Sequence, residues 1–220
     1  MTAHDLGSMA WTDVGSPILV VPVGSCEQHG PHLPLATDTI IATALARALA
    51  DRRSDCVVAP ALTISASGEH QGFAGTLSIG SAAMADLLIE LVRSADWSQG
   101  VVFVNGHGGN AAAMTRADDV LTRESRRALV WWPSVPGGDP HAGHVETSLM
   151  LALAPGEVHL DRAVAGPVPA MAELVRVGVQ PLSPSGVLGD PTRATAEAGR
   201  QLFDELTAQL VAAVARWFAQ

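Results

Sequence analysis

The chain has 220 residues, of which 48% are hydrophobic and 16% are charged, and its formal net charge is −9. The chain has 22 acidic residues and only 13 basic ones. No basic stripe is therefore available to bind a phosphate backbone, and we expect no nucleic-acid partner. All 13 basic residues are arginine and tyrosine is absent, which excludes chemistry that needs a Schiff-base lysine, a Walker A lysine or a catalytic tyrosine.

The sequence carries no targeting signal that we recognise. Residues 1–13 have neither the cationic start nor the apolar stretch of a signal peptide. No apolar run approaches the ~18–20 residues that a transmembrane helix needs. Cys26 and Cys56 are too few for a disulfide framework. We therefore expect a cytoplasmic protein without a membrane partner.

Short apolar, β-branched runs alternate with stretches of helical periodicity along the chain. The runs predict strands over residues 18–23, 56–59, 100–104 and 129–132. The periodic stretches predict helices over residues 38–53 (with Thr37 as cap), 81–96, 111–126 and 196–218. Residues 167–194, richer in proline and glycine, are expected to form a structured loop. This order predicts one α/β domain over residues 1–220, with three α/β/α layers and a mostly parallel central sheet.

Polar side chains follow the predicted strands at the points where the strands end. Glu27 and His29 come just after the first strand, His107 after the third, and His141 and Glu146 after the fourth. Ligand sites of parallel sheets lie outside the carboxyl ends of the strands. We therefore expect these side chains to gather at one edge of the sheet.

Two carboxylates and two imidazoles in these segments suit a metal centre. Glu27, His29, Asp38 and His107 offer the mixed nitrogen and oxygen ligands that Zn(II), Fe(II) and Mn(II) accept. They exceed what one catalytic ion needs, and a carboxylate such as Asp38 can bridge two ions that activate a shared hydroxide. A single histidine at a strand end is more often structural, but the four residues together favour metal.

Other kinds of function remain open at this point. The Asn105–Asn110 segment could offer backbone amides to a phosphate, although it lacks the G-x-G-x-x-G spacing. A serine hydrolase is disfavoured because the chain has no Gly-x-Ser-x-Gly elbow. A non-catalytic scaffold could hold a metal for structural reasons alone, but such a site would be closed and would need no spare acid.

The motifs together resemble the creatininase family. They are Glu-Gln-His-Gly-Pro-His-Leu-Pro from residue 27, Asn-Gly-His-Gly-Gly-Asn from residue 105, and His-Ala-Gly-His-Val-Glu-Thr-Ser from residue 141. The resemblance implies a cytoplasmic, homo-oligomeric amidohydrolase, a hexamer or octamer, with a creatininase-like α/β/α fold. It also implies two divalent ions, one held by Glu27, Asp38 and His107 and the other by His29 and a bridging Asp38.

One position departs from the family pattern. Creatininase has a glutamate two residues after the histidine of its Asn-Gly-His motif, and that glutamate completes the second metal site. This sequence has Gly109 there. Glu146 is the natural replacement ligand, and the ordinary alternative is a carboxylate that caps or pairs with the helix that follows. The departure also puts creatinine in doubt as the substrate.

Further segments resemble one branch of the family, the peptidases of mycofactocin biosynthesis. They include Gly-Ser-Cys-Glu-Gln-His from residue 24, Ala-Ser-Gly-Glu-His from residue 66, Gly-Thr-Leu-Ser-Ile-Gly from residue 75 and Gly-Val-Leu-Gly-Asp-Pro-Thr from residue 186. This branch implies hydrolysis of the modified precursor peptide before its decarboxylated, cross-linked C-terminal Val-Tyr unit; the alternative is an amidohydrolase that opens creatinine or another small cyclic amide. We expect His141 to transfer a proton or hydrogen-bond the intermediate. Ser67 and Trp132 are candidate substrate contacts, although strand alternation does not decide between Trp132 and Trp131.

Overall fold

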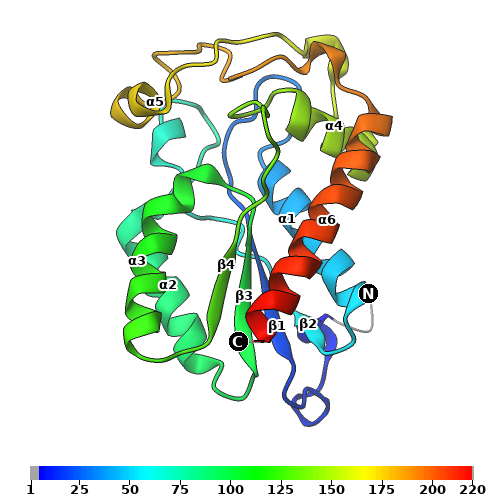
Figure 1. Cartoon of the computed structure of the whole chain (residues 1–220). Helices are drawn as coiled ribbons and strands as arrows, with labels where there is room; N and C mark the ends of the chain where they lie inside the picture. Colours follow the sequence, from blue (N-terminus) through cyan, green and yellow to red (C-terminus); the bar gives the residue numbers. More distant parts are fainter. Residues whose placement is uncertain (1–4, 220) are drawn as a thin grey trace.

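A four-stranded, fully parallel sheet forms the centre of the molecule, in the order β2-β1-β3-β4 (Figure 1). The computed structural model describes residues 5–219. The strands are β1 (Ile18–Val23), β2 (Cys56–Val58), β3 (Gly100–Asn105) and β4 (Ala128–Trp131). Because β1 and β3 are buried along their whole length, they consist almost entirely of apolar residues, as the sequence predicts for a covered parallel sheet.

Helices cover both faces of the sheet. They are α1 (Thr37–Arg52), α2 (Gly80–Ser94), α3 (Ala111–Arg123), α4 (His144–Leu153), α5 (Met171–Val177) and α6 (Ala196–Phe218). Figure 1 shows α2 and α3 on one side of the sheet, and α1 and α6 on the other. The expected three α/β/α layers and parallel sheet are therefore confirmed.

Alternation along β1 divides the core into two parts. Ile18 and Val20 pack with α1 and α6 in one apolar cluster, whereas Leu19, Val21 and Val23 pack with α2 and α3 in the other. Successive side chains of a strand point to opposite faces, so one buried strand supplies both clusters. The sheet is thus held rigidly between two independent apolar layers.

The segment between α4 and α6 lies across the carboxyl ends of the strands. We call residues 160–190 the covering segment; in Figure 1 it runs over the top of the molecule. It is ordered, as expected, but it contains the short helix α5, which its proline- and glycine-rich composition did not predict. Buried Val179, Val187 and Leu188 anchor it to the body of the protein.

Several predicted boundaries were wrong by one to three residues. Thr37 is not the cap of α1 but its first helical residue, and its hydroxyl donates to the carbonyl of Pro34 at 2.7 Å. Helix α3 ends at Arg123 because Ser125, with φ of 55°, adopts a left-handed conformation that ends the helix. Strand β4 ends at Trp131, so Trp132 lies just beyond it rather than inside it.

Candidate metal centre

Glu27, Asp38 and His107 come together at the carboxyl ends of β1 and β3. Glu27 follows β1, Asp38 is the second residue of α1, and His107 follows β3. Nδ1 of His107 lies 3.1 Å from Oε1 of Glu27 and 3.2 Å from Oδ2 of Asp38. All three side chains are buried, and their ligand atoms lie within 4.8 Å of one another.

A second group of three shares Asp38 with the first. Nε2 of His29 lies 3.0 Å from Oδ1 of Asp38 and 3.8 Å from Oε2 of Glu146, which stands in the first turn of α4. The two carboxylate oxygens of Asp38 therefore face different groups, Oδ1 toward His29 and Oδ2 toward His107. This is the arrangement that a bridging carboxylate between two ions requires.

The donor set fits divalent ions. Ligand atoms that share one ion at about 2.0–2.2 Å lie about 3.0–3.5 Å apart, which matches the distances in the first group. Among residues 5–219, Glu27 is fully buried and neither of its carboxylate oxygens accepts a hydrogen bond. A buried carboxylate without hydrogen-bond donors is costly unless a cation neutralises it.

The electrostatics of the two imidazoles also show that the cluster attracts positive charge. Burial lowers the pKa of His29, but the Asp38 carboxylate outweighs that effect and raises the pKa to about 10. At His107 burial again lowers the pKa, but the neighbouring Asp38 and Glu27 carboxylates outweigh that effect and raise the pKa well above its ordinary value. The carboxylates thus favour a cation at each imidazole, either a proton or a metal ion.

Neighbouring groups fix the orientation of the clustered side chains. Ser25 Oγ donates to Oδ2 of Asp38 at 2.8 Å, and Nδ1 of His29 donates to the backbone carbonyl of Glu27 at 3.2 Å. With its Nδ1 so engaged, His29 presents Nε2 to Asp38 and Glu146. Such contacts are typical of metal-ligating histidines, whose second nitrogen is held by a carbonyl or carboxylate.

Gln28 joins two further histidines to the cluster. Its amide nitrogen lies 2.8 Å from Nδ1 of His70, 3.0 Å from Nε2 of His141 and 3.1 Å from the carbonyl of Gly186. A carbonyl can only accept, so Nε2 of His141 donates to the backbone carbonyl of Gln28 at 2.8 Å. That tautomer leaves Nδ1 of His141 without a proton and 3.8 Å from Oε1 of Glu27. His141 could accept a proton there, or serve as a ligand with Glu27 and His29.

The turn before α4 sets the position of Glu146. Ala142, buried and in a left-handed conformation with φ of 52°, donates its N–H to Oε2 of Glu146 at 2.5 Å. Burial raises the pKa of Glu146 to about 7. Strained non-glycine backbone of this kind collects at functional sites. Glu146 thus both caps the turn and faces His29, so the two roles considered for it are compatible.

The two candidate substrate contacts lie differently. Ser67 is fully buried, and its hydroxyl is 3.5 Å from Nε2 of His107. Trp131 packs in the apolar cluster beneath α1 and α6, whereas Trp132 is 38% exposed beyond the end of β4. Their roles toward a substrate stay predictions.

Sequence reasoning did not assign Gln28, Glu69 or His70 to the site. Nε2 of His70 lies 3.4 Å from Oε1 of Glu27, and Oε1 of Glu69 lies 3.3 Å from Nε2 of His107. The signal available was the polar run from Ser67 to His70 in the loop after the second strand. Nothing in that run indicates which strand end its side chains reach.

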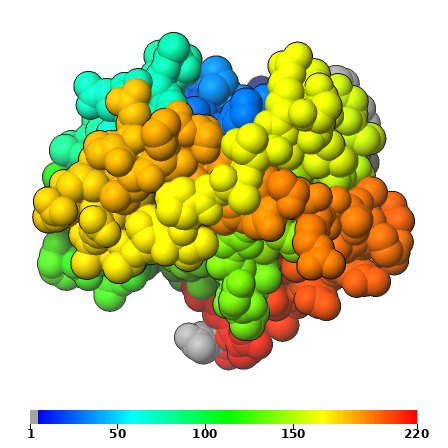
Figure 2. Space-filling view, turned by 90° about the horizontal axis from the view of Figure 1, so that it is seen from above, coloured from blue at the N-terminus to red at the C-terminus, as the bar shows by residue number. Residues whose placement is uncertain are grey.

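The covering segment closes over the cluster. Gly186 accepts from Gln28, and Leu188 exchanges backbone hydrogen bonds with His141. Figure 2, seen from above, shows this segment in yellow and orange spread over this end of the molecule. Glu27, His29, Asp38 and His107 are therefore buried at the covered end of the sheet, whereas the side chain of Glu146 is 23% exposed.

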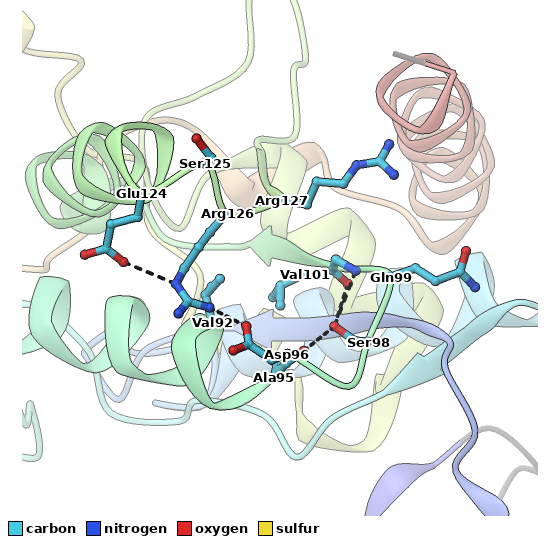
Figure 3. Close-up of a pocket in the computed structure, with 11 residues that line it drawn as sticks. Val92, Ala95, Asp96, Ser98, Gln99, Val101, Glu124, Ser125, Arg126 and Arg127 are labelled. Carbon is cyan, nitrogen blue, oxygen red and sulfur yellow. Dashed lines mark hydrogen bonds and ion pairs between the residues drawn. The ribbon is translucent and has the colours of Figure 1, made fainter.

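A separate hollow of about 410 Å³ lies at the opposite edge of the sheet, where β3 begins (Figure 3). It is lined by polar groups, and Arg126 pairs there with Asp96 and Glu124. Ligand sites of parallel sheets lie at the carboxyl ends of the strands, so this hollow at the opposite edge is not the expected ligand site.

In residues 5–219 no helix is long and apolar enough to cross a membrane.

Comparisons with known proteins agree with this geometry. A family model described as creatininase, creatinine amidohydrolase, matches residues 2–214. The mycofactocin precursor peptide peptidase of Mycobacterium tuberculosis (strain CDC 1551 / Oshkosh) is 51% identical over 220 residues, covering 93% of this chain and 87% of that one. The creatinine amidohydrolase of Pseudomonas putida is 30% identical over 247 residues, covering 90% of this chain and 91% of that one. A solved structure titled "Creatininase Mn" superimposes with a TM-score of 0.87 at 25% identity over 100% of both chains.

Proposed function

The chain belongs to the creatininase family, a family of metal-dependent amidohydrolases, and on that premise we propose that it is the peptidase that cleaves a modified mycofactocin precursor peptide. It is a hydrolase of amide or peptide bonds. The observation that carries the proposal is the pair of three-ligand groups that share Asp38. The 51% identity to a relative named for this reaction supports the substrate.

The proposed ligands are divided between two divalent ions. Glu27, Asp38 and His107 would hold one ion, and His29, Asp38 and Glu146 the other. This mixture of imidazole and carboxylate favours Fe(II) or Zn(II) and also accepts Mn(II). When bound, the ions would supply an activated water and polarise the carbonyl of the bond to be cut.

The remaining residues move protons and exclude water. His141 has its Nε2 hydrogen committed to the Gln28 carbonyl, so its Nδ1 can take up a proton and pass it to the leaving amine. Burial lowers the pKa of His141 well below its ordinary value, with His29 and His70 adding to the effect, which keeps the ring neutral with a free lone pair on Nδ1. The covering segment, whose Gly186 binds Gln28, shields these groups from solvent.

The proposed substrate is a peptide with a modified C-terminus. The bond cut would precede the decarboxylated, cross-linked Val-Tyr unit, and its aromatic group would suit a pocket wall such as Trp132. Ser67, buried beside His107, is the proposed polar contact. Both assignments follow the family resemblance.

The proposed setting is a cytoplasmic homo-oligomer of six or eight subunits, as in the family. Exposed apolar side chains support association: Val168 is 68% exposed, Met171 63% and Val175 79%. Light scattering of the purified protein measures the subunit number directly.

The test is mass spectrometry of the modified precursor peptide incubated with freshly metallated protein. We expect release of the C-terminal two-residue unit, dependent on metal and absent from a chelated sample. His141→Ala, metallated in the same way, is the matched control for cleavage by a contaminating peptidase, because it should bind metal and cleave very slowly.

An intact peptide together with metal-dependent opening of creatinine would keep the metal centre and reject the peptidase assignment. That result would favour the activity named for the relative from Pseudomonas putida. An intact peptide and an intact cyclic amide, with metal bound, would favour a non-catalytic scaffold instead.

A further inference from the structure

Gly109, two residues after His107, occupies a position with no room for any side chain. A Cβ atom there would lie 1.9 Å from Oε1 of Glu69, 2.4 Å from Nε2 of His107 and 2.6 Å from the carbonyl of Ala66. Gly109 is not among the residues with positive φ, so an L-residue could adopt its backbone conformation. What glycine provides at this position is therefore space, not backbone freedom.

The Glu69 carboxylate fills that space. Glu69 lies in the short 3-10 turn Gly68–His70, and its Oε1 is 3.3 Å from Nε2 of His107. The carbonyl of Ala66 lies 3.0 Å from the same nitrogen. Two acceptors thus hold one side of the His107 ring, and Nδ1 on the other side faces Glu27 and Asp38.

We infer that Glu69 is a positioning residue for the candidate ligand His107, and that Gly109 is glycine because it must admit the Glu69 carboxylate. The inference rests on the proposed metal centre. A carboxylate on the second nitrogen of a ligating imidazole fixes its tautomer and strengthens it as a ligand. The family resemblance leads us to expect a carboxylate at position 109. In this protein the carboxylate of Glu69, from the segment after β2, lies in that space instead.

The main chain of Glu69 is held independently of its side chain. Its carbonyl accepts a hydrogen bond from the N–H of Val179 in the covering segment at 2.9 Å. The side chain is 25% exposed and belongs to neither apolar cluster. Replacing the carboxylate therefore leaves these backbone contacts in place and isolates its effect on His107.

The experiment is a titration of apo protein with Co(II), followed by its visible absorption, which reports both the dissociation constant and the ligand geometry. Glu69→Ala should weaken binding at the His107 site by about 10–100-fold, the usual cost of losing such a partner. Glu69→Gln, which keeps an acceptor oxygen but not the charge, should lose less. Glu173→Ala, an exposed carboxylate on α5, is the matched control and should bind as the unaltered protein does.

A second pair of variants tests the shared space. Gly109→Glu alone should bind Co(II) poorly, because its side chain would collide with the Glu69 carboxylate, the His107 ring and the carbonyl of Ala66. In the double variant Glu69→Ala/Gly109→Glu the first of these collisions is gone, so Co(II) binding should exceed that of Gly109→Glu alone.

Unchanged Co(II) affinity and an unchanged spectrum in Glu69→Ala would overturn the inference while leaving the proposed function intact. If circular dichroism shows that Glu69→Ala does not fold, the near-isosteric Glu69→Gln takes its place in the titration. Unchanged Co(II) binding in Glu69→Gln would then overturn the inference. If the unaltered protein binds no Co(II), the proposed metal centre itself fails, and the inference fails with it.

Discussion

Glu27 and His141 show how single side chains divide the work of the site. Glu27 lies at the centre, with His107, His70 and His141 at 3.1, 3.4 and 3.8 Å from its Oε1. His107 also contacts Asp38, so it is tied to the ligand groups on two sides. His141 approaches Glu27 only at 3.8 Å and packs its ring against His29, while its Nε2 is held by the carbonyl of Gln28. Substitution of His107 and substitution of His141 should therefore have different consequences.

His141→Ala should lower turnover by about 10²–10⁴-fold, the usual contribution of a general acid or base. The metal content should stay unchanged, because both three-ligand groups that share Asp38 are complete without His141. Steady-state kinetics and elemental analysis of the same sample measure the two quantities. A variant that has lost an ion would place His141 among the ligands rather than among the proton carriers.

The two cysteines should differ sharply in reactivity. Burial raises the pKa of Cys56 in β2 to about 11, so at pH 8 the thiolate fraction is about a hundredfold lower than for an ordinary thiol. Cys26 is only half-buried. A thiol reagent should modify one cysteine per folded chain, and none in Cys26→Ser until denaturant is added. Rapid labelling of Cys56 in the folded variant would contradict the buried position of β2.

The ligands could be predicted from sequence because each lies just after an apolar run, where side chains of a parallel sheet converge. Gln28, Glu69 and His70 could not be assigned, since their importance depends on partners far along the chain. Glu69 contacts His107, which lies 38 positions further along the chain, and no local pattern encodes that contact. The empty space at Gly109 is likewise visible only in three dimensions.

At the scale of elements, the strands and the long helices were predictable because apolar periodicity records which face is buried. The residues at which these elements begin and end were less predictable, because tertiary contacts decide them. Thr37 has the residue type of a cap, but its hydroxyl reaches back to Pro34 and the helix begins one residue earlier. Helix α5 has no buried residue, and therefore no apolar face that the sequence could reveal.

Two glycines set how closely helices approach their neighbours, and they allow a paired prediction. A Cβ at Gly199 of α6 would lie 1.8 Å from the Ser148 carbonyl of α4, and a Cβ at Gly24 would lie 2.4 Å from Cα of Thr39 in α1. Gly199→Ala should cost about 2–3 kcal/mol of unfolding free energy through overpacking. Gly24→Ala should also weaken metal binding, because it displaces α1, whose second residue is Asp38.

Thermal denaturation and a metal titration separate the two effects. Gly156→Ala is the control, since its Cβ would meet nothing within 4 Å and its φ is not positive. A Gly199→Ala protein as stable as Gly156→Ala would mean that α4 and α6 are less tightly packed than described. Unaltered metal affinity in Gly24→Ala would mean that α1 does not position Asp38.

At the scale of the whole molecule, the apolar core and the candidate metal centre are separate. Neither apolar cluster includes a proposed ligand, and the clusters lie on the two faces of the sheet rather than at its edge. The fold therefore does not depend on bound ions for its core. The expected single domain stays a prediction, to be checked by whether unfolding is one cooperative transition.

Chelation should consequently abolish turnover without unfolding the protein. Far-ultraviolet circular dichroism should keep its helical signal, while the melting temperature falls, because ions that bind only the native state stabilise it by about 2.7 kcal/mol at 100 times their Kd. Restoring the metal should restore both activity and melting temperature. Loss of the helical signal on chelation would identify a structural metal and argue against a catalytic one.

Asp38 serves two groups whose other members are encoded at different distances along the chain. Glu27 and His107 complete the first group before α3 begins, whereas the second waits for Glu146 in α4. The chain is synthesised from its N-terminus, so β1, β3 and every ligand of the first group exist before the last ligand of the second group is made. The two groups thus differ in the order in which their ligand sets are completed.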